Sequence, residues 1–331
     1  MLPANLAIPF SGPRDASANT RDRIDALSQQ LSSGRQSDLG RAVGSDFSEV
    51  SHLSFKMRDL ATVRDSLSLA QAWTDGIQSA LEAVSEANDR TLAAIPSSLS
   101  PPSQASISRL SDVADGVLDD IGTAMSGSIG GRYLFANGDV NAPISDMEAV
   151  RSDIASIAQN STDFGTYLAD VTAYFDAGGA FETTIVSSYA SEQATFPGRD
   201  GKSFGVDLDA RSAGLKEAIA NAAVLSGMRH VGFDVSELVK SSAASMLLTR
   251  ASAADADVST MQAQVGVLEE RISDDREAAV SERLDAEKRL SDLVGIDEYD
   301  VATRLNAELS RLEAAYAITA RRSQLRLTNF L

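Results

Sequence analysis

The sequence predicts a mainly α-helical protein: an elongated antiparallel helical bundle or coiled coil, formed by the N- and C-terminal segments, with a small inserted β-containing (α+β) domain. Apolar residues recur every three or four positions over about 45 residues from Asp46, against about 11–12 in an average helix. A second stretch of this kind runs from near Ser236 to Gly295. Between the two, after Gly130-Gly131, the chain is richer in Gly, Thr, Phe and Tyr. Long helices therefore flank a different kind of segment.

The first predicted helix follows a proline-containing start. About fifteen residues with little periodicity, which we expect to be extended or disordered in the isolated chain, precede Ile24, Leu27 and Leu31 at helical spacing. Gly34 then follows two serines, which is typical of a helix C-terminus.

The second helix is predicted to begin at Asp46, with Glu49 three residues on in capping-box spacing, and to end in the segment from Pro96 to Pro102, which cannot be helical throughout. A third helix runs from Ile107 to Ile129. Because only a short proline-rich turn separates the two, we expect them to be antiparallel neighbours.

The middle of the chain, residues 132–211, is predicted to be a small inserted domain. A turn is expected at Asn137-Gly138 and a short helix over Phe164–Phe175. β-like runs cover Thr183–Ser188 and Ser203–Leu208.

The C-terminal part returns to helical spacing at Ala213–Leu225 and continues as one very long helix from near Ser236. Its stretch from Asp274 to Arg289 is nearly all charge and alanine, so we expect one wide face to be solvated. Gly295 ends this helix, and Asp297 can cap a last one that runs to the end of the chain.

These elements predict three parts. Residues 1–45 and 296–331 form terminal helices, residues 46–131 and 212–295 form a helical bundle, and residues 132–211 form an inserted, solvent-facing domain.

The composition excludes several classes of protein. The net charge of −18 disfavours nucleic-acid binding, and the absence of cysteine excludes disulfide scaffolds and thiol chemistry. No apolar run is long enough for membrane insertion, and from the first residues we expect no cleavable secretory signal.

No residues indicate catalysis, so the chain is not expected to be an enzyme, to hold a metal or to bind a cofactor. His52 and His230 lack ligand spacing. Asp207 and Asp209 alternate, but Arg211 and Ala218 stand where a calcium loop needs acids.

Further polar and aromatic groups favour structural roles. The carboxylate pairs Asp119-Asp120, Glu269-Glu270 and Asp274-Asp275 are typical of solvated helix faces. Tyr133, Phe135 and Asn137 could form a binding patch, but they fit the core of the inserted domain better.

The terminal helices carry the clearest functional signal. Amphipathic helices with apolar stripes that one helix pair cannot bury predict self-association. The candidate subunit-assembly residues are Ile24, Leu27, Leu31, Leu305, Leu312, Tyr316, Leu325, Leu327, Phe330 and Leu331.

The two ends resemble the bacterial flagellin superfamily. The run LEAAYAITARRSQLRLTNFL, from Leu312 to Leu331, is similar to its C-terminal signature, and LSQQLSSGR, from Leu27 to Arg35, to its N-terminal element. Residues 67–71 and 81–88 resemble its first long helix. The resemblance covers about residues 1–135 and 210–331.

Within the superfamily, the stretch GRYLFANGDVNAP from Gly131 to Pro143 is similar to a turn of the L-type hook–filament junction proteins. Filament flagellin is the alternative. The chain departs from the superfamily in its first residues and in the link RQSDLGRAVGSDF after Gly34.

The resemblance implies an extracellular structural protein of the flagellum, exported unfolded through the flagellar type III channel. It implies self-association into a ring or tubular layer, contact with an adjacent hook-associated protein and flagellin, and an export chaperone. Two alternatives from other classes are a secreted helical effector or translocator and an enzyme within the inserted domain; the long apolar segment and the His-Glu-x-x-His motif that they would need are absent from the sequence.

Overall fold

The computed structural model describes residues 13–38, 40, 46–137, 139–144, 146–186 and 194–328, with residues 13–17 and 322–328 described by their backbone alone. Contacts divide the chain into two units: Met1–Ala61 with Val280–Leu331, and Thr62–Ala279.

The first unit contains helix α1 (Pro13–Ser33), which begins earlier than predicted. Most of the segment that we expected to be extended or disordered, residues 1–12, lies outside the described residues. Pro13 is the first helical residue, a position where its fixed φ and missing N–H are tolerated. The predicted end is confirmed. Gly34 has φ +66° and donates its N–H to the carbonyl of Gln30 at 2.9 Å.

Helix α10 (Glu298–Thr328) begins as the sequence predicts. The Asp297 carboxylate accepts the backbone N–H groups of Tyr299 and Asp300 at 3.0 and 3.1 Å. Gly295 stops the preceding helix. A Cβ there would lie 2.3 Å from the carbonyl oxygen of Ser291, so this position accepts only glycine without a shift.

The first unit also holds the start of α3 (Ser48–Leu99) and the end of α9 (Ala243–Val294). Asp46 accepts the Ser48 N–H at 2.9 Å and so supports the start of α3. The two segments share a small apolar core of Leu53, Ala286, Leu290 and Val294.

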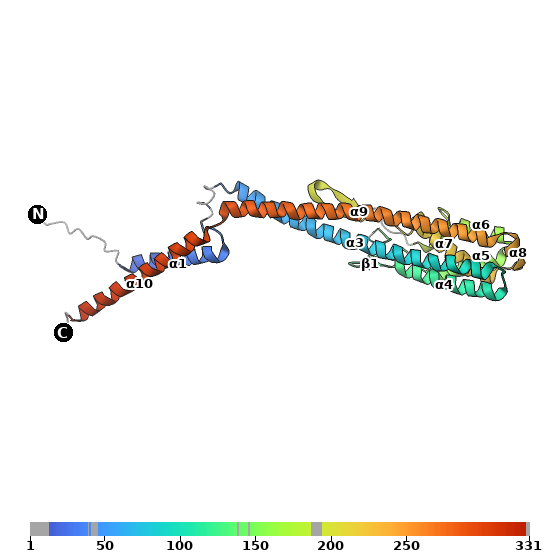
Figure 1. The fold of residues 1–331 in the computed structure, drawn as a ribbon, viewed down its shortest axis with the longest axis horizontal. Coiled ribbons are helices and arrows are strands. Elements are labelled where there is room, and N and C mark those ends of the chain that lie inside the picture. Colours follow the sequence, from blue (N-terminus) through green and yellow to red (C-terminus); the bar gives the residue numbers. More distant parts are fainter. Residues whose placement is uncertain are drawn as a thin grey trace. The chain divides into compact units, whose positions relative to one another are not determined.

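In the second unit, α3 and α9 run antiparallel (Figure 1). Polar side chains on α3 bond to the backbone of α9. The amide of Asn88 donates to the carbonyl of Ala251, and that of Gln78 to the carbonyl of Gln262, both at 2.9 Å. The pairing confirms the predicted helical bundle of N- and C-terminal segments.

Helix α3 ends within the proline-containing segment where its end is predicted. Pro96 lies inside the helix, which stops at Leu99. Since proline lacks an N–H, this costs one hydrogen bond in the last turn, where the helix can still close.

Helix α4 (Gln104–Met125) follows after a turn and is shorter than predicted. Ser103 and Ser106 form a reciprocal capping box at its start. Ile129, which we expected in this helix, instead lies in strand β1 (Ser128–Ile129), paired with β2 (Arg132–Tyr133).

The middle segment is mixed, as predicted. It contains α5 (Met147–Asn160), α6 (Phe164–Phe175), the hairpin strands β3 (Thr195–Pro197) and β4 (Ser203–Gly205), and the short helix η2 (Arg199–Gly201). The predicted helix over Phe164–Phe175 is confirmed. The predicted β-like run from Thr183 is wrong, because η1 (Phe181–Ile185) is one π-helical turn; Ser187 and Ser188 lie outside the described residues.

Helix α7 (Ala213–Gly227) is the centre around which α4, α5 and α6 pack. The buried Tyr167 hydroxyl of α6 donates to the Val224 carbonyl at 2.6 Å, and burial raises the pKa of this phenol. A Cβ on Gly227 would lie 2.3 Å from the Tyr167 hydroxyl and 2.7 Å from Ile154, so the close approach of these helices requires glycine.

The predicted very long helix from Ser236 is interrupted. After η3 (Met228–His230), the short α8 (Ser236–Lys240) ends at Ser241 and Ser242, and Ser242 has φ +53°. A left-handed residue cannot continue an α-helix, so α9 begins anew at Ala243.

The described residues between 132 and 211 belong to the second unit, where α5 and α6 pack against α7. The three-part division of the chain stays a prediction. Among the described residues, no helix combines the length and apolar character that crossing a lipid bilayer requires.

Truncating the buried core of α3 should destabilise the second unit. Leu81 is fully buried, so Leu81→Ala should lower the free energy of unfolding by about 2–5 kcal/mol. Leu69, on the same helix, is 48% exposed and provides the control, with an expected loss below about 1 kcal/mol. Urea unfolding followed by circular dichroism measures both, and equal losses would contradict this view of the core.

Candidate assembly interface and charged anchors

The terminal helices α1 and α10 pack side by side in antiparallel orientation (Figure 1). The Arg21 guanidinium donates from Nε to the Tyr316 hydroxyl at 3.1 Å, and an isolated β-bridge joins Arg35 to Gly295 at the other end of the pair. As the residue number rises from Arg21 to Arg35, that of the contacted residue falls from Tyr316 to Gly295. The two helices therefore run in opposite directions. This is the pairing of chain ends on which the predicted assembly site depends.

A buried carboxylate lies between these two helices. Glu308 is 8% exposed, and its Oε1 lies 2.8 Å from Arg311 Nη1 and 3.6 Å from Arg23 Nη1. Glu308 Oε2 is buried and accepts no hydrogen bond within the described part of the chain. Because sliding the helices would separate Glu308 from Arg23, the ion pair favours one register.

The apolar residues of the pair are only partly covered by it. Ile24, Leu27, Leu305 and Leu312 are half-buried. Four others are exposed by more than a third: Leu31 at 37%, Leu309 at 41%, Tyr316 at 47% and Ile318 at 62%. The pair thus retains apolar surface available to further helices.

The remaining assembly candidates are not tested. Leu325 and Leu327 lie in α10, but their side chains are outside the described part, and Phe330 and Leu331 lie outside the described residues altogether. Ile318, which the structure shows to be exposed, is not among the sequence candidates, because it falls two residues after Tyr316, off the spacing of the stripe.

The other candidate residues do not form a common site. His52 and His230 are exposed and belong to different units. Phe135 is fully buried and its carbonyl accepts the Ala210 N–H at 3.0 Å, which confirms its place in a core. Among the described residues, no group of three or more His, Asp or Glu side chains could hold a metal ion.

One acidic residue corrects the prediction of a solvated face on α9. Asp275 is 3% exposed, because the β3–β4 hairpin covers it. It accepts the Arg199 backbone N–H at 2.8 Å and lies 3.3 Å from Arg199 Nε and 3.0 Å from Lys202 Nζ. Its carboxylate therefore anchors the hairpin to α9.

At Asp275, hydrogen bonds and a nearby positive charge together affect the pKa of the carboxyl more than burial does. Burial would raise the pKa of this carboxyl, but the Arg199 N–H and the Lys202 ammonium hold it below its usual value. The hairpin also places the ring of Phe196 against that of Trp73, the only tryptophan in the chain. The two ring centroids lie 5.9 Å apart.

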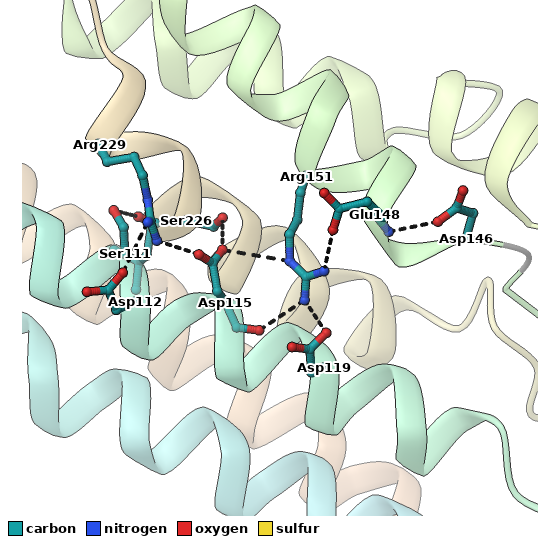
Figure 2. A network of polar contacts seen from close by, with 10 residues as sticks. Ser111, Asp112, Asp115, Asp119, Asp146, Glu148, Arg151, Ser226 and Arg229 are labelled. Atoms are coloured by element: carbon teal, nitrogen blue, oxygen red, sulfur yellow. Dashed lines mark hydrogen bonds and ion pairs between the residues drawn. The ribbon is translucent and has the colours of Figure 1, made fainter.

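A second set of charged contacts joins α4 to α5 and to the end of α7 (Figure 2). Arg151 of α5 bonds to Asp119, lies 2.9 Å from Glu148 and donates to the Asp115 carbonyl at 3.2 Å. Asp115 also accepts hydrogen bonds from Ser226 and Arg229.

The geometry of this network follows from helical spacing. Asp112, Asp115 and Asp119 are three and four residues apart, so they share one face of α4. Arg229 lies 3.0 Å from Asp112 and also pairs with Asp115, while Arg151 takes the other side of the row (Figure 2). The two arginines, Arg151 in α5 and Arg229 in η3, thus tie these two elements to the acidic face of α4.

Comparison with models of known protein families finds no match for this chain, and no curated protein sequence matches it.

Removing Arg151 should loosen α5 from α4. Its side chain is 19% exposed and bonds to Asp119, Glu148 and the Asp115 carbonyl, so Arg151→Ala should cost about 1.5–3 kcal/mol of unfolding free energy. Arg90→Ala is the matched control, since Arg90 pairs with Asp120 while both side chains are about half exposed, and should cost about 0–1 kcal/mol. Chemical unfolding of the two variants tests this, and a larger loss for Arg90→Ala would refute it.

Asp275 should make stability depend on pH. Because its folded pKa is lowered, its contribution is complete above the unfolded pKa of about 3.9 and is lost as the pH falls through the folded value. Asp275→Asn should cost about 1–3 kcal/mol at pH 7 and progressively less below pH ~4. Unfolding at several pH values, followed by Trp73 fluorescence, measures this.

The adjacent, exposed Asp274 supplies the control. Asp274→Asn should change the unfolding free energy by less than about 0.5 kcal/mol at every pH. A pH-independent difference between Asp275→Asn and the unmodified chain would show that the carboxylate charge does not anchor the hairpin.

Proposed function

We propose that this chain is a structural subunit of the bacterial flagellum that joins hook to filament, assembling through its terminal helices after type III export. The observation that carries the proposal is the helix pair α1–α10, which leaves Leu309, Tyr316 and Ile318 between 41% and 62% exposed. A polymer of identical subunits gives those side chains a place to pack.

The energetics favour contacts beyond one chain. An isolated helix pair in water buries little apolar surface, and most helical stability in proteins comes from packing. Covering a half-exposed leucine or isoleucine contributes on the order of 1 kcal/mol. Several such residues on each helix, repeated around a ring, would stabilise an assembly without any single strong contact.

The sequence supports the flagellar interpretation more directly. The C-terminal run from Leu312 and the LSQQLSSGR element from Leu27 resemble the two ends of the flagellin superfamily, and these are the segments that pair as α1 and α10. The turn from Gly131 to Pro143 favours a junction protein. The proposed location is extracellular, at the hook–filament junction.

The proposed partners follow from this role. The subunits would contact each other in a ring or tubular layer, an adjacent hook-associated protein and flagellin, with an export chaperone before secretion. Filament flagellin is the second candidate, because the terminal motifs are common to the whole superfamily. No catalytic or cofactor role is proposed.

Deleting Leu312–Leu331 should abolish assembly but leave the second unit folded. The deletion removes Tyr316 and Ile318 and the rest of the C-terminal stripe, whereas Trp73 and its surroundings belong to the other unit. Electron microscopy and sedimentation should find polymers only for the full chain, while Trp73 fluorescence stays unchanged. Tyr299→Ala is the control, because Tyr299 is 84% exposed at the start of α10. Polymers formed by the truncated chain would refute the proposed role of the helix.

A deletion strain separates the two flagellar candidates. Loss of a junction protein should leave cells that secrete flagellin monomer without building filaments. Loss of filament flagellin should instead remove the main secreted subunit itself.

A further inference from the structure

A small hollow lies where the β3–β4 hairpin meets α9. Its volume is about 230 Å³, and it is open to solvent. The residues that line it are Arg199, Lys202, Phe204, Arg271, Asp274 and Asp275. Five of these six residues are charged, which sets the hollow apart from an apolar groove.

The hairpin wall of the hollow is rigidly built. A Cβ on Gly198 would lie 2.5 Å from the Phe204 ring and 2.9 Å from Asp275, so backbone and side chains are in close contact there. Asp200 and Gly201 both adopt positive φ, at 55° and 75°, and the Gly198 N–H donates to the Lys202 carbonyl at 2.9 Å. Such a turn holds the wall in one shape.

The charges of the lining are not all satisfied within the chain. Asp275 is already bonded by Arg199 and Lys202. Arg271 lies over the Phe204 ring at 5.9 Å and forms no ion pair with any residue that the structure describes. Among the described residues that line the hollow, three are cationic and two are carboxylates, within a chain whose net charge is −18.

An uncommitted guanidinium beside a second cation suits a carboxylate. The planar fork of Arg271 can donate two parallel hydrogen bonds to the two oxygens of one carboxylate, while its stacking on Phe204 limits the loss of side-chain freedom. Lys202, whose side chain is 56% exposed, adds a nearby positive charge.

Because the hollow is open to solvent, a free anion and a carboxylate on another protein surface would bind there with different strength. A single exposed ion pair binds a free anion only weakly. A carboxylate on a surface already held nearby by other contacts has a high effective concentration, and the same pair then contributes to association.

We infer that this hollow receives an aspartate or glutamate side chain of a second copy of this chain. Charge complementarity favours that occupant, since the chain carries 47 acidic against 29 basic side chains. The inference rests on the proposed function, in which assembly through the terminal helices brings copies together. It assigns an electrostatic subunit contact to the second unit.

Carbodiimide cross-linking tests the contact directly. In Arg271→Lys, the introduced amine attacks the activated carboxyl of a neighbouring acid, which forms an amide and releases a urea. Polymers made from equal amounts of 15N-labelled and unlabelled Arg271→Lys chains should give mixed-isotope peptides that link position 271 to an acidic residue, as identified by mass spectrometry. Links confined to peptides of one isotope would overturn the inference.

Charge reversal gives a second readout on the full-length chain. Arg271→Glu should slow polymerisation about tenfold, whereas Arg276→Glu should change it less than about twofold. Arg276 is the matched control because it is exposed on the same helix, does not line the hollow, and donates to Gln71 at 3.0 Å. Circular dichroism and Trp73 fluorescence check that both variants fold.

The outcomes separate the two proposals. If the unmodified chain does not polymerise, the proposed function fails, and this inference fails with it. If it polymerises and Arg271→Glu polymerises as fast as Arg276→Glu, only this inference fails. Titration of the monomer with malonate is the third arm: saturable binding lost in Arg271→Glu, with polymerisation unaffected, would make a free anion the occupant and overturn the inference.

Discussion

The pairing of α3 with α9 is the interaction on which the rest of the second unit depends. Apolar spacing alone would let two long helices slide past each other by a turn. The buried Asn88 amide bonded to the Ala251 carbonyl, and the partly buried Gln78 amide bonded to that of Gln262, remove this freedom, because a slipped pair would leave these amides, Asn88 above all, without their partners. With the register fixed, Asp275 faces the hairpin that covers it.

Basic side chains, which are fewer than the acidic ones, hold together the acidic elements around this helix pair. Basic residues contact several acceptors at once: Arg151 and Arg229 span the carboxylates of α4, and Arg250 donates to Asn221, Thr172 and Glu217, thereby joining α9 to α6 and α7. In a chain of net charge −18, unpaired carboxylates would repel each other across these faces. Arginine suits this role because its fork can donate in several directions.

Local signals in the sequence predicted the local features well. Helix α6, the Gly34 and Gly295 stops and the Asp297 cap depend on residues within one or two turns, so spacing and capping chemistry were sufficient. The misses needed partners distant in sequence or unusual backbone geometry. Asp275 was predicted to be solvated, but its partner Arg199 lies 76 residues away, and the α8–α9 break depends on the positive φ of Ser242. The assembly candidates whose side chains the structure describes are half-buried or exposed. That they contact a neighbouring subunit stays a prediction.

Several polar anchors in the core share one trait: their acceptor is a backbone carbonyl. Ser111 donates to Leu225, Tyr167 to Val224 and Asn88 to Ala251, in each case to the main chain. A main-chain acceptor keeps its position when its own side chain changes. Positions 224, 225 and 251 can therefore vary among residues that fit the available volume without loss of these bonds, whereas the three donors cannot. In this core, substitutions should therefore be tolerated better at the positions in α7 and α9 whose carbonyls accept these bonds than at the three donor positions.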